Sequence, residues 1–187
     1  KFNGEVISAD SRQVYRGLNI GTGKITKREM KGIPHHLLDV ASSERSFSAD
    51  DFVRYAQEKI QEISMRGALP IIAGGTGFYV DALVGRIVLP SVPPNHELRL
   101  RLEKKSAAQL FTMLKRQDPR RAKTMSSPSE RNNKVRLIRA LEIAHTLGNI
   151  PNLDLRNPEY RNSEYNILWV GIKPKVETLK RKIFKRL

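Results

Sequence analysis

Two short apolar runs set the hydrophobic pattern of the first half of the chain. Val6-Ile7 is one run and Leu69–Ala73 is the other, and each is bounded by small or polar residues, as is typical of buried strands. Between them an apolar side chain recurs at helical spacing behind a Ser48 N-cap, at Phe52, Ala56, Ile60 and Ile63. This strand, helix, strand order predicts a parallel pair joined by a right-handed crossover, and therefore an α/β core.

The pattern changes after a proline-rich stretch at residues 89–94. Residues 95–148 show helical apolar spacing with capping signals, among them the box Ser106–Gln109. Residues 165–172 predict a strand that returns to the sheet, and an amphipathic basic helix follows. We expect three parts: an α/β core over 1–90, a basic helical insertion over 91–150, and a linker, return strand and start of a core helix over 151–187.

Charge is distributed unevenly along the 187 residues. Lys and Arg number 34 against 19 acidic residues, a net charge of +15. Residues 91–140 hold 13 basic and 4 acidic side chains, whereas residues 1–90 hold 12 and 10. Such segregation indicates a segment that faces a polyanion, nucleic acid first, with a merely solvated basic surface as the alternative.

Two absences narrow the class of protein. The chain has no cysteine, which excludes disulfides and thiolate metal sites and is typical of a reducing cytosol, so a cytoplasmic location is expected. No apolar run approaches the roughly 20 residues that span a bilayer, so we expect no membrane partner.

The first chemical signal follows the Val6-Ile7 strand. Asp10 and Ser11 come at its carboxyl end, where open α/β sheets place their ligand crevices, and Arg12 and Gln13 stand just beyond. A carboxylate there is suited to accept a proton while its neighbours hold a polar substrate. The alternative is that Asp10 only caps a turn or a helix.

The second signal is Gly74-Gly75-Thr76-Gly77, between the Leu69–Ala73 strand and an apolar helix. Glycines let the backbone approach a ligand, the helix offers free N–H groups, and Thr76 adds a hydroxyl. A diphosphate or a developing negative charge suits such a place, although tight packing alone also explains many glycine turns. Asp10 and Thr76 are expected at the same edge of one sheet.

Two other motifs carry less weight. Gly21-Thr22-Gly23-Lys24 resembles a Walker loop but lacks its first glycine and the Ser or Thr after the lysine. We therefore interpret it as a mobile loop, with phosphate as its candidate ligand. His35 and His36 are adjacent and therefore point in different directions, which favours structural or substrate-lining roles over a metal pair.

Five segments together resemble the tRNA dimethylallyltransferase (tRNA isopentenyltransferase) family, in its order and at about its spacing. They are residues 7–15, 17–22, 34–39, 74–79 and 136–142. The resemblance implies a P-loop NTPase-like parallel sheet with helices on both faces and a mostly helical insertion. It also implies transfer of a dimethylallyl group from dimethylallyl diphosphate to N6 of the adenosine 3′ of a tRNA anticodon, with Mg²⁺ as cofactor. The expected partners are the tRNA anticodon stem-loop and dimethylallyl diphosphate, and the expected state is a monomer.

The same resemblance assigns roles to individual residues. Asp10 corresponds to the general base that accepts a proton from N6, and Thr76 to a threonine that contacts the substrates near the diphosphate. The positions that match tRNA-contacting ones are Asp10, Ser11, Arg12, Gln13, Thr76, Arg99, Val135, Arg136, Leu137, Ile138 and Arg139.

The chain departs from the family pattern in two places. The family's Gly-Pro-Thr-x-Ser-Gly-Lys-Thr phosphate loop is not found, so we expect an incomplete, nearly inactive chain whose diphosphate and Mg²⁺ ligands lie on that loop. Arg131-Asn132-Asn133-Lys134 also replaces an Asn-Asp-Pro-Gln-like run. The alternatives are an isopentenyltransferase acting on free adenine nucleotides, a non-catalytic RNA-binding module, and a small-molecule kinase with a P-loop fold.

Overall fold

The computed structural model describes residues 2–125, 127–148 and 165–185. The chain forms two compact units, residues 1–89 with 155–187, and residues 90–154, which are described separately below. The predicted linker at 151–163 lies outside the described residues. In the described part of the chain, none of the helices has both the length and the apolar character needed to cross a membrane.

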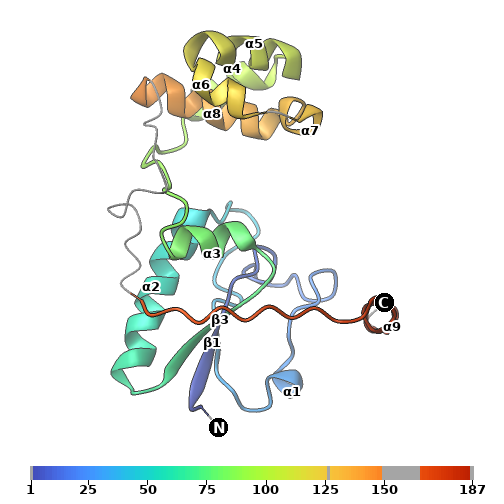
Figure 1. Cartoon of the computed structure of the whole chain (residues 1–187). Helices are drawn as coiled ribbons and strands as arrows, with labels where there is room; N and C mark the ends of the chain where they lie inside the picture. Colours follow the sequence, from blue (N-terminus) through green and yellow to red (C-terminus); the bar gives the residue numbers. More distant parts are fainter. Residues whose placement is uncertain (1, 126, 149–164, 186–187) are drawn as a thin grey trace. The chain divides into compact units, whose positions relative to one another are not determined.

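The first unit is built on a parallel sheet with the order β2-β1-β3; Figure 1 labels the neighbouring strands β1 and β3. Its strands are β1 (Gly4–Ser8), β2 (His35–His36) and β3 (Leu69–Ala73). β1 pairs with β3 from Gly4 opposite Leu69 to Ser8 opposite Ala73. The two strands predicted from the apolar runs are therefore confirmed, and they are immediate neighbours.

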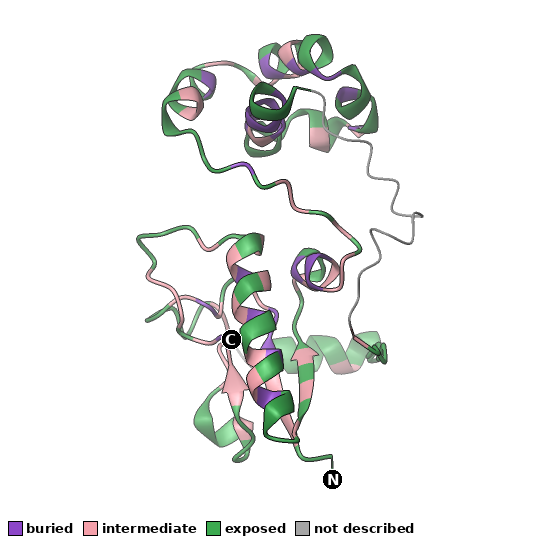
Figure 2. Cartoon of the chain, turned by 90° about the vertical axis from the view of Figure 1, so that its left-hand side faces the viewer, coloured by how far each residue is buried: buried purple, intermediate pink, exposed green. Residues whose placement is uncertain are grey.

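The crossover helix α2 (Ala49–Met65) packs against β1 and β3. Ser48 and Asp51 form the capping box that starts it. Its buried residues are those predicted from the helical spacing, and Figure 2 shows them along one side of the helix: Phe52, Ala56, Ile60 and Ile63. Helix α3 (Gly77–Leu83) packs on α2, with the Tyr79 ring stacked on Phe52 at a centroid distance of 4.6 Å.

The two faces of β3 differ in burial. Ile72 packs into the core against α2, whereas Leu69 and Ile71, on the opposite face, are 50% and 40% exposed. Alternate residues of a strand point to opposite faces, so among the described residues one face of β3 is packed against the core and the other is partly exposed. The parallel α/β class is confirmed. The sequence predicted β3 as a buried strand, and the structure buries only one of its two faces.

The predicted strand over residues 165–172 is not found. The chain there has no strand pairing, and Leu168 and Ile172 are 87% and 90% exposed. An apolar run specifies a strand only where a sheet edge accepts its backbone hydrogen bonds, and the run alone does not reveal that edge. The basic helix predicted to follow it is present as α9 (Val176–Phe184). A short helix, α1 (Lys27–Met30), completes the described elements of this unit.

The second unit is helical, as predicted for its segment. Its helices are α4 (His96–Glu103), α5 (Ala107–Gln117), α6 (Pro119–Thr124), α7 (Pro128–Arg131) and α8 (Lys134–Leu147). α8 packs against α4, α5 and α7 around a core of leucines, chiefly Leu102, Leu110, Leu114, Leu137 and Leu141. The capping box Ser106–Gln109 is confirmed, and α7 begins with a further box, Ser127–Glu130, that the prediction passed over.

The backbone at Gly74 lies against the backbone of Ala9, one position past the last residue pair of β1 and β3. A Cβ added there would lie 2.2 Å from the Ala9 carbonyl oxygen, while one added at Gly75 meets nothing within 4 Å. We predict that Gly74→Ala lowers the free energy of unfolding by about 1–3 kcal/mol, because the backbone of Ala9 must move. Urea unfolding of Gly74→Ala beside the control Gly75→Ala checks this, and equal midpoints for the two variants would contradict it.

Candidate functional site

Asp10 lies directly past the carboxyl end of β1, and its carboxylate is held by three donors. Oδ1 accepts the backbone N–H groups of Arg12 at 2.8 Å and Gln13 at 3.2 Å, and Oδ2 accepts the Gln13 amide at 3.3 Å. Asp10 therefore does cap the turn, as the alternative interpretation proposed. The same bonds fix the carboxylate in one orientation at the sheet edge, so capping does not exclude a chemical role.

Thr76 reaches the same edge from β3. Its Oγ1 accepts the backbone N–H of Ser11 at 3.0 Å, and its own N–H donates to the Ala9 carbonyl at 3.1 Å. The hydroxyl makes no capping bond to α3, although Thr76 is the N-cap of that helix. The expected proximity of the Asp10 and Thr76 segments is thus observed, through a side-chain contact between residues that are 65 positions apart in the sequence.

A pocket of about 310 Å³ opens beside Asp10. It is lined by Val6, Ser8, Asp10, Gln13, Gly23, Ile25, Glu29, His35, Ala73 and Gly74, and Thr76 is not among these residues. The Gln13 side chain joins two walls, because its Oε1 accepts the Ile25 N–H at 3.3 Å while its amide donates to Asp10. Gln13 therefore couples the loop before α1 to the position of the carboxylate.

The loop that resembles a Walker motif contributes glycine rather than lysine to this pocket. The Lys24 side chain is 6% exposed, donates to the Tyr15 carbonyl at 2.6 Å and forms an ion pair with Asp39. Gly23, by contrast, lines the pocket. The loop therefore offers backbone to the pocket, and the charge of Lys24 is paired with the half-exposed Asp39.

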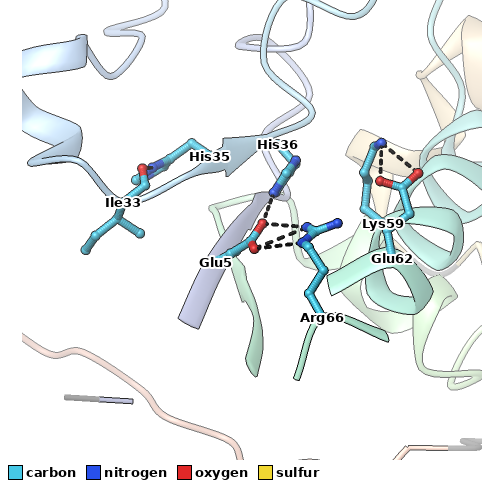
Figure 3. A network of polar contacts seen from close by, with 7 residues as sticks. All are labelled: Glu5, Ile33, His35, His36, Lys59, Glu62 and Arg66. Carbon is cyan, nitrogen blue, oxygen red and sulfur yellow. Dashed lines mark hydrogen bonds and ion pairs between the residues drawn. The ribbon is translucent and has the colours of Figure 1, made fainter. Parts of the chain in front are cut away.

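The two histidines have different environments, as their adjacent positions predicted. His35 lines the pocket, and its Nδ1 is 2.8 Å from the Ile33 carbonyl oxygen. His36 Nε2 is 2.6 Å from Glu5 Oε2, on the far side of the strand from that contact (Figure 3).

Glu5 is the centre of a structural network that joins β1, β2 and the end of α2. Besides His36 it accepts both Nε and Nη2 of Arg66, the residue that follows α2 (Figure 3). Hydrogen bonds from Arg66 and then His36 lower the pKa of the Glu5 carboxyl. His36 is therefore structural. Among the residues that the structure describes, no three His, Asp or Glu side chains gather as a metal site requires.

Arg99 and Arg139, both expected to contact tRNA, share one buried carboxylate in the helical unit. Glu142 is fully buried and accepts Arg99 Nε and Nη2 at 2.8 Å each, Arg139 Nη1 at 2.6 Å and the Asn95 N–H at 2.7 Å. Burial raises the pKa of Glu142, but the bonds from Arg99, the Asn95 N–H and Arg139 outweigh it and lower the pKa to about 2. The Arg99 guanidinium ties α4 to α8, whereas Arg139 lies on α8 with Glu142 and also donates to the Val92 carbonyl. The two side chains are still 34% and 36% exposed.

The other α8 residues expected to contact tRNA are exposed or buried according to their position around the helix. Val135 is 78% exposed, and the Arg136 side chain is 62% exposed beside Glu130, at 3.6 Å. Leu137 and Ile138 are buried in the leucine core. Arg136 and Arg139 are three positions apart on α8, yet Arg139 turns inward to Glu142 and to the Val92 carbonyl.

Sequence reasoning missed several of these relationships. Glu142 follows Ile138 by four residues on the apolar stripe of its helix, and a carboxylate on such a stripe signals a buried ion pair with an arginine three residues before it. No comparable sequence signal indicates that Glu29 lines the pocket or that Gln13 contacts Ile25. Both features depend on how a loop folds back over the sheet.

The model of the IPP transferase family matches residues 13–187, which is nearly the whole chain. The chain belongs to the IPP transferase family.

Relatives in this family are similar over the full chain. The tRNA dimethylallyltransferases of Leuconostoc citreum and Bacillus subtilis are 42% and 36% identical over 186 and 190 residues. Each match covers 100% of this chain and 60% or 59% of the relative, so the chain spans about 60% of the length of the curated relatives.

Solved structures of the family resemble the fold. The tRNA isopentenylpyrophosphate transferase of Bacillus halodurans is 38% identical, with a TM-score of 0.58 over 99% of this chain and 56% of that one. A eukaryotic dimethylallyltransferase acting on tRNA is 32% identical, with a TM-score of 0.62 over 76% of this chain and 35% of that one.

The Thr76 hydroxyl is predicted to stabilise the site by accepting the Ser11 N–H. Thr76→Val keeps the shape of the side chain but leaves that donor without its acceptor, so it is expected to lower the free energy of unfolding by about 1–2 kcal/mol. Thr76→Ser keeps the acceptor and serves as the control. Urea midpoints distinguish the two, and a valine variant as stable as the serine variant would show that the bond contributes nothing.

The buried Glu142 network predicts an acid-dependent loss of stability. Because the pKa of Glu142 falls from its ordinary 4.5 to about 2 on folding, its stabilisation is present above pH 4.5 and is lost as the pH falls toward 2. The loss is roughly 3 kcal/mol for a shift of this size. Unfolding free energies measured across this range for the native chain and Glu142→Gln should converge at low pH. A difference that does not change with pH would rule out this role.

Proposed function

We propose that this chain provides the central part of a tRNA dimethylallyltransferase. In this proposal a dimethylallyl group passes from dimethylallyl diphosphate to N6 of the adenosine 3′ of the anticodon, and Asp10 is the general base. The single observation that carries it is the Asp10 carboxylate, fixed at the end of β1 by three donors beside a pocket of about 310 Å³. The names of its relatives supply the reaction class.

The geometry supports the assignment of the base. Oδ1 is occupied by two backbone N–H groups, and Oδ2 accepts one longer bond from Gln13. An acceptor position on Oδ2 is therefore left for a proton that arrives from the pocket. In the proposed step N6 forms a bond to C1 of the dimethylallyl group, and the C–O bond to the diphosphate breaks. The electron pair leaves with the diphosphate, and the N6 proton moves to Asp10.

Two glycine-bearing walls fit a phosphorylated substrate beside that carboxylate. Gly74 lines the pocket at the end of β3 and Gly23 lines it from the loop, and both bring backbone close to the space. Thr76 lies just beyond Gly74, with its hydroxyl bound to the Ser11 N–H. We propose that this edge contacts the dimethylallyl end of the donor and the part of the diphosphate next to it.

Mg²⁺ remains an expectation from the family resemblance. The described residues do not fit a magnesium site by themselves, because no three of their carboxylate or imidazole groups gather. Asp10 offers one open acceptor position, on Oδ2, and the proposed step uses it for the N6 proton. We therefore derive no step of the reaction through a metal held by these residues.

The helical unit supplies the proposed tRNA surface. Exposed Val135 and Arg136 lie on α8, and the guanidinium groups of Arg99 and Arg139 remain about one-third exposed while bound to Glu142. The net positive charge of residues 91–140 supports binding to an RNA backbone. An enzyme acting on free adenine nucleotides has less use for such a surface.

Transfer of a labelled dimethylallyl group tests the proposal. The protein is one of the relatives' length that contains these 187 residues, and the acceptors are tRNA and AMP. Asp10→Asn keeps an acceptor for the backbone N–H groups of Arg12 and Gln13 but is a much weaker base, so kcat is expected to fall roughly 10²- to 10⁴-fold, far more than the Kd for tRNA changes. Asp50→Asn, an exposed position in the first turn of α2, is the matched control.

Each rival function has its own outcome in this assay. Transfer to AMP in preference to tRNA would replace the proposal by the nucleotide-modifying enzyme. If Asp10→Asn modified tRNA at the native rate, Asp10 would not be the base. A protein of full family length that binds tRNA and transfers nothing would indicate a non-catalytic RNA-binding module.

A further inference from the structure

A second pocket, of about 430 Å³, lies within the helical unit. It is lined by Phe111 and Lys115 of α5, Pro119, Ala122 and Lys123 of α6, and Arg131 of α7. The term basic pocket is used below for these residues. None of the residues that the sequence predicted to contact tRNA is among them.

The charge in the basic pocket has one sign. Three of its six lining residues are cationic, and none is acidic. In the part of the chain that the structure describes, Lys115, Lys123 and Arg131 form no ion pair with a carboxylate, although other arginines of the same unit do. Three cations that remain without a counter-ion around one concavity favour an anionic ligand.

An aromatic ring holds two of these cations in place. The Lys115 ammonium lies 4.9 Å from the centre of the Phe111 ring, and the Arg131 guanidinium carbon lies 5.5 Å from it. Arg131 Nε also donates to the Met125 carbonyl at 2.9 Å. The cations are therefore oriented before any ligand arrives, which lowers the entropic cost of binding.

The basic pocket also adjoins the proposed tRNA surface. Arg131 follows Glu130 on α7, and Glu130 pairs with the exposed Arg136 of α8. A polyanion that reaches Arg136 can continue to the pocket by way of neighbouring residues of α7. The apolar wall of Phe111 and Pro119 suits a ribose or base beside a phosphate.

We propose that the basic pocket binds a backbone phosphate of the tRNA substrate, with Lys115, Lys123 and Arg131 as its ligands. The inference rests on the proposed function, because it names a contact of the same RNA. A phosphate contact of this kind sets affinity and register and does not read the base sequence. The pocket is therefore expected to contribute to KM for tRNA rather than to kcat.

Binding of a labelled anticodon stem-loop RNA at several salt concentrations tests this proposal, with the full-length protein. Lys115→Gln/Lys123→Gln should weaken the Kd about tenfold near 100 mM salt. It should also make the slope of log K against log salt shallower by roughly 0.7–0.9, the contribution of one phosphate contact. Arg101→Gln/Lys104→Gln removes two charges from the α4 region outside the pocket and is the matched control.

A second variant distinguishes the effect of orienting the cations from the effect of their total charge. Phe111→Leu keeps all cations and most of the apolar volume but removes the ring, and it should weaken the Kd roughly two- to fivefold. Thermal unfolding of each variant checks that the leucine core is intact. Prenyl transfer at saturating tRNA should keep the native kcat in every pocket variant, with a raised KM.

The outcomes distinguish this proposal from the proposed function. Equal losses in the pocket and control variants, or an unchanged salt slope, would overturn the pocket while transfer to tRNA stands. Inorganic phosphate that binds the native protein but not the pocket variants, together with an RNA affinity that is equal in all of them, would assign the pocket to free phosphate instead of RNA. If the native protein neither binds the stem-loop nor modifies tRNA, the proposed function itself fails.

Discussion

The parallel pairing of β1 with β3 is the interaction on which the site depends. Five consecutive residue pairs bring both strands to the same edge, and past the last pair the Ala9 carbonyl meets the backbone at Gly74 and accepts the Thr76 N–H. The Ser11 N–H then reaches the Thr76 hydroxyl. Two segments far apart in sequence are thereby held together by backbone geometry before any side chain of the pocket contributes.

The helical unit follows a different principle, because a buried charge organises part of it. Glu142 collects donors from α4, from α8 and from the Asn95 backbone, while the neighbouring leucines supply the apolar core. A single buried carboxylate is costly unless several donors surround it, so the cluster specifies one arrangement of the helices. Two cations of a basic segment are thus engaged in structure, and others remain for a ligand.

Much of the architecture was readable from periodicity and capping. The β1 and β3 runs, the Ser48 box and the leucine stripes each carry a local signal that does not need tertiary information. The predicted strand at 165–172 was wrong because strand formation depends on a partner edge, which sequence does not reveal. At the site, Asp10 and Thr76 could be placed from the strand ends. The Gln13 contact with Ile25 could not, since it depends on a loop that closes from the side.

The shared carboxylate of Arg99 and Arg139 has a consequence for recognition. A free arginine gives up much rotamer freedom when it meets a phosphate, whereas these two already have their torsions set by Glu142. In the proposed complex, an approaching RNA strand would contact two guanidinium groups that are already oriented instead of two flexible side chains. In the proposed tRNA complex, ions in the surrounding solution would screen the exposed edge of each guanidinium group without reaching the buried carboxylate. Raising the ionic strength would then release the RNA while the two arginines keep their orientation.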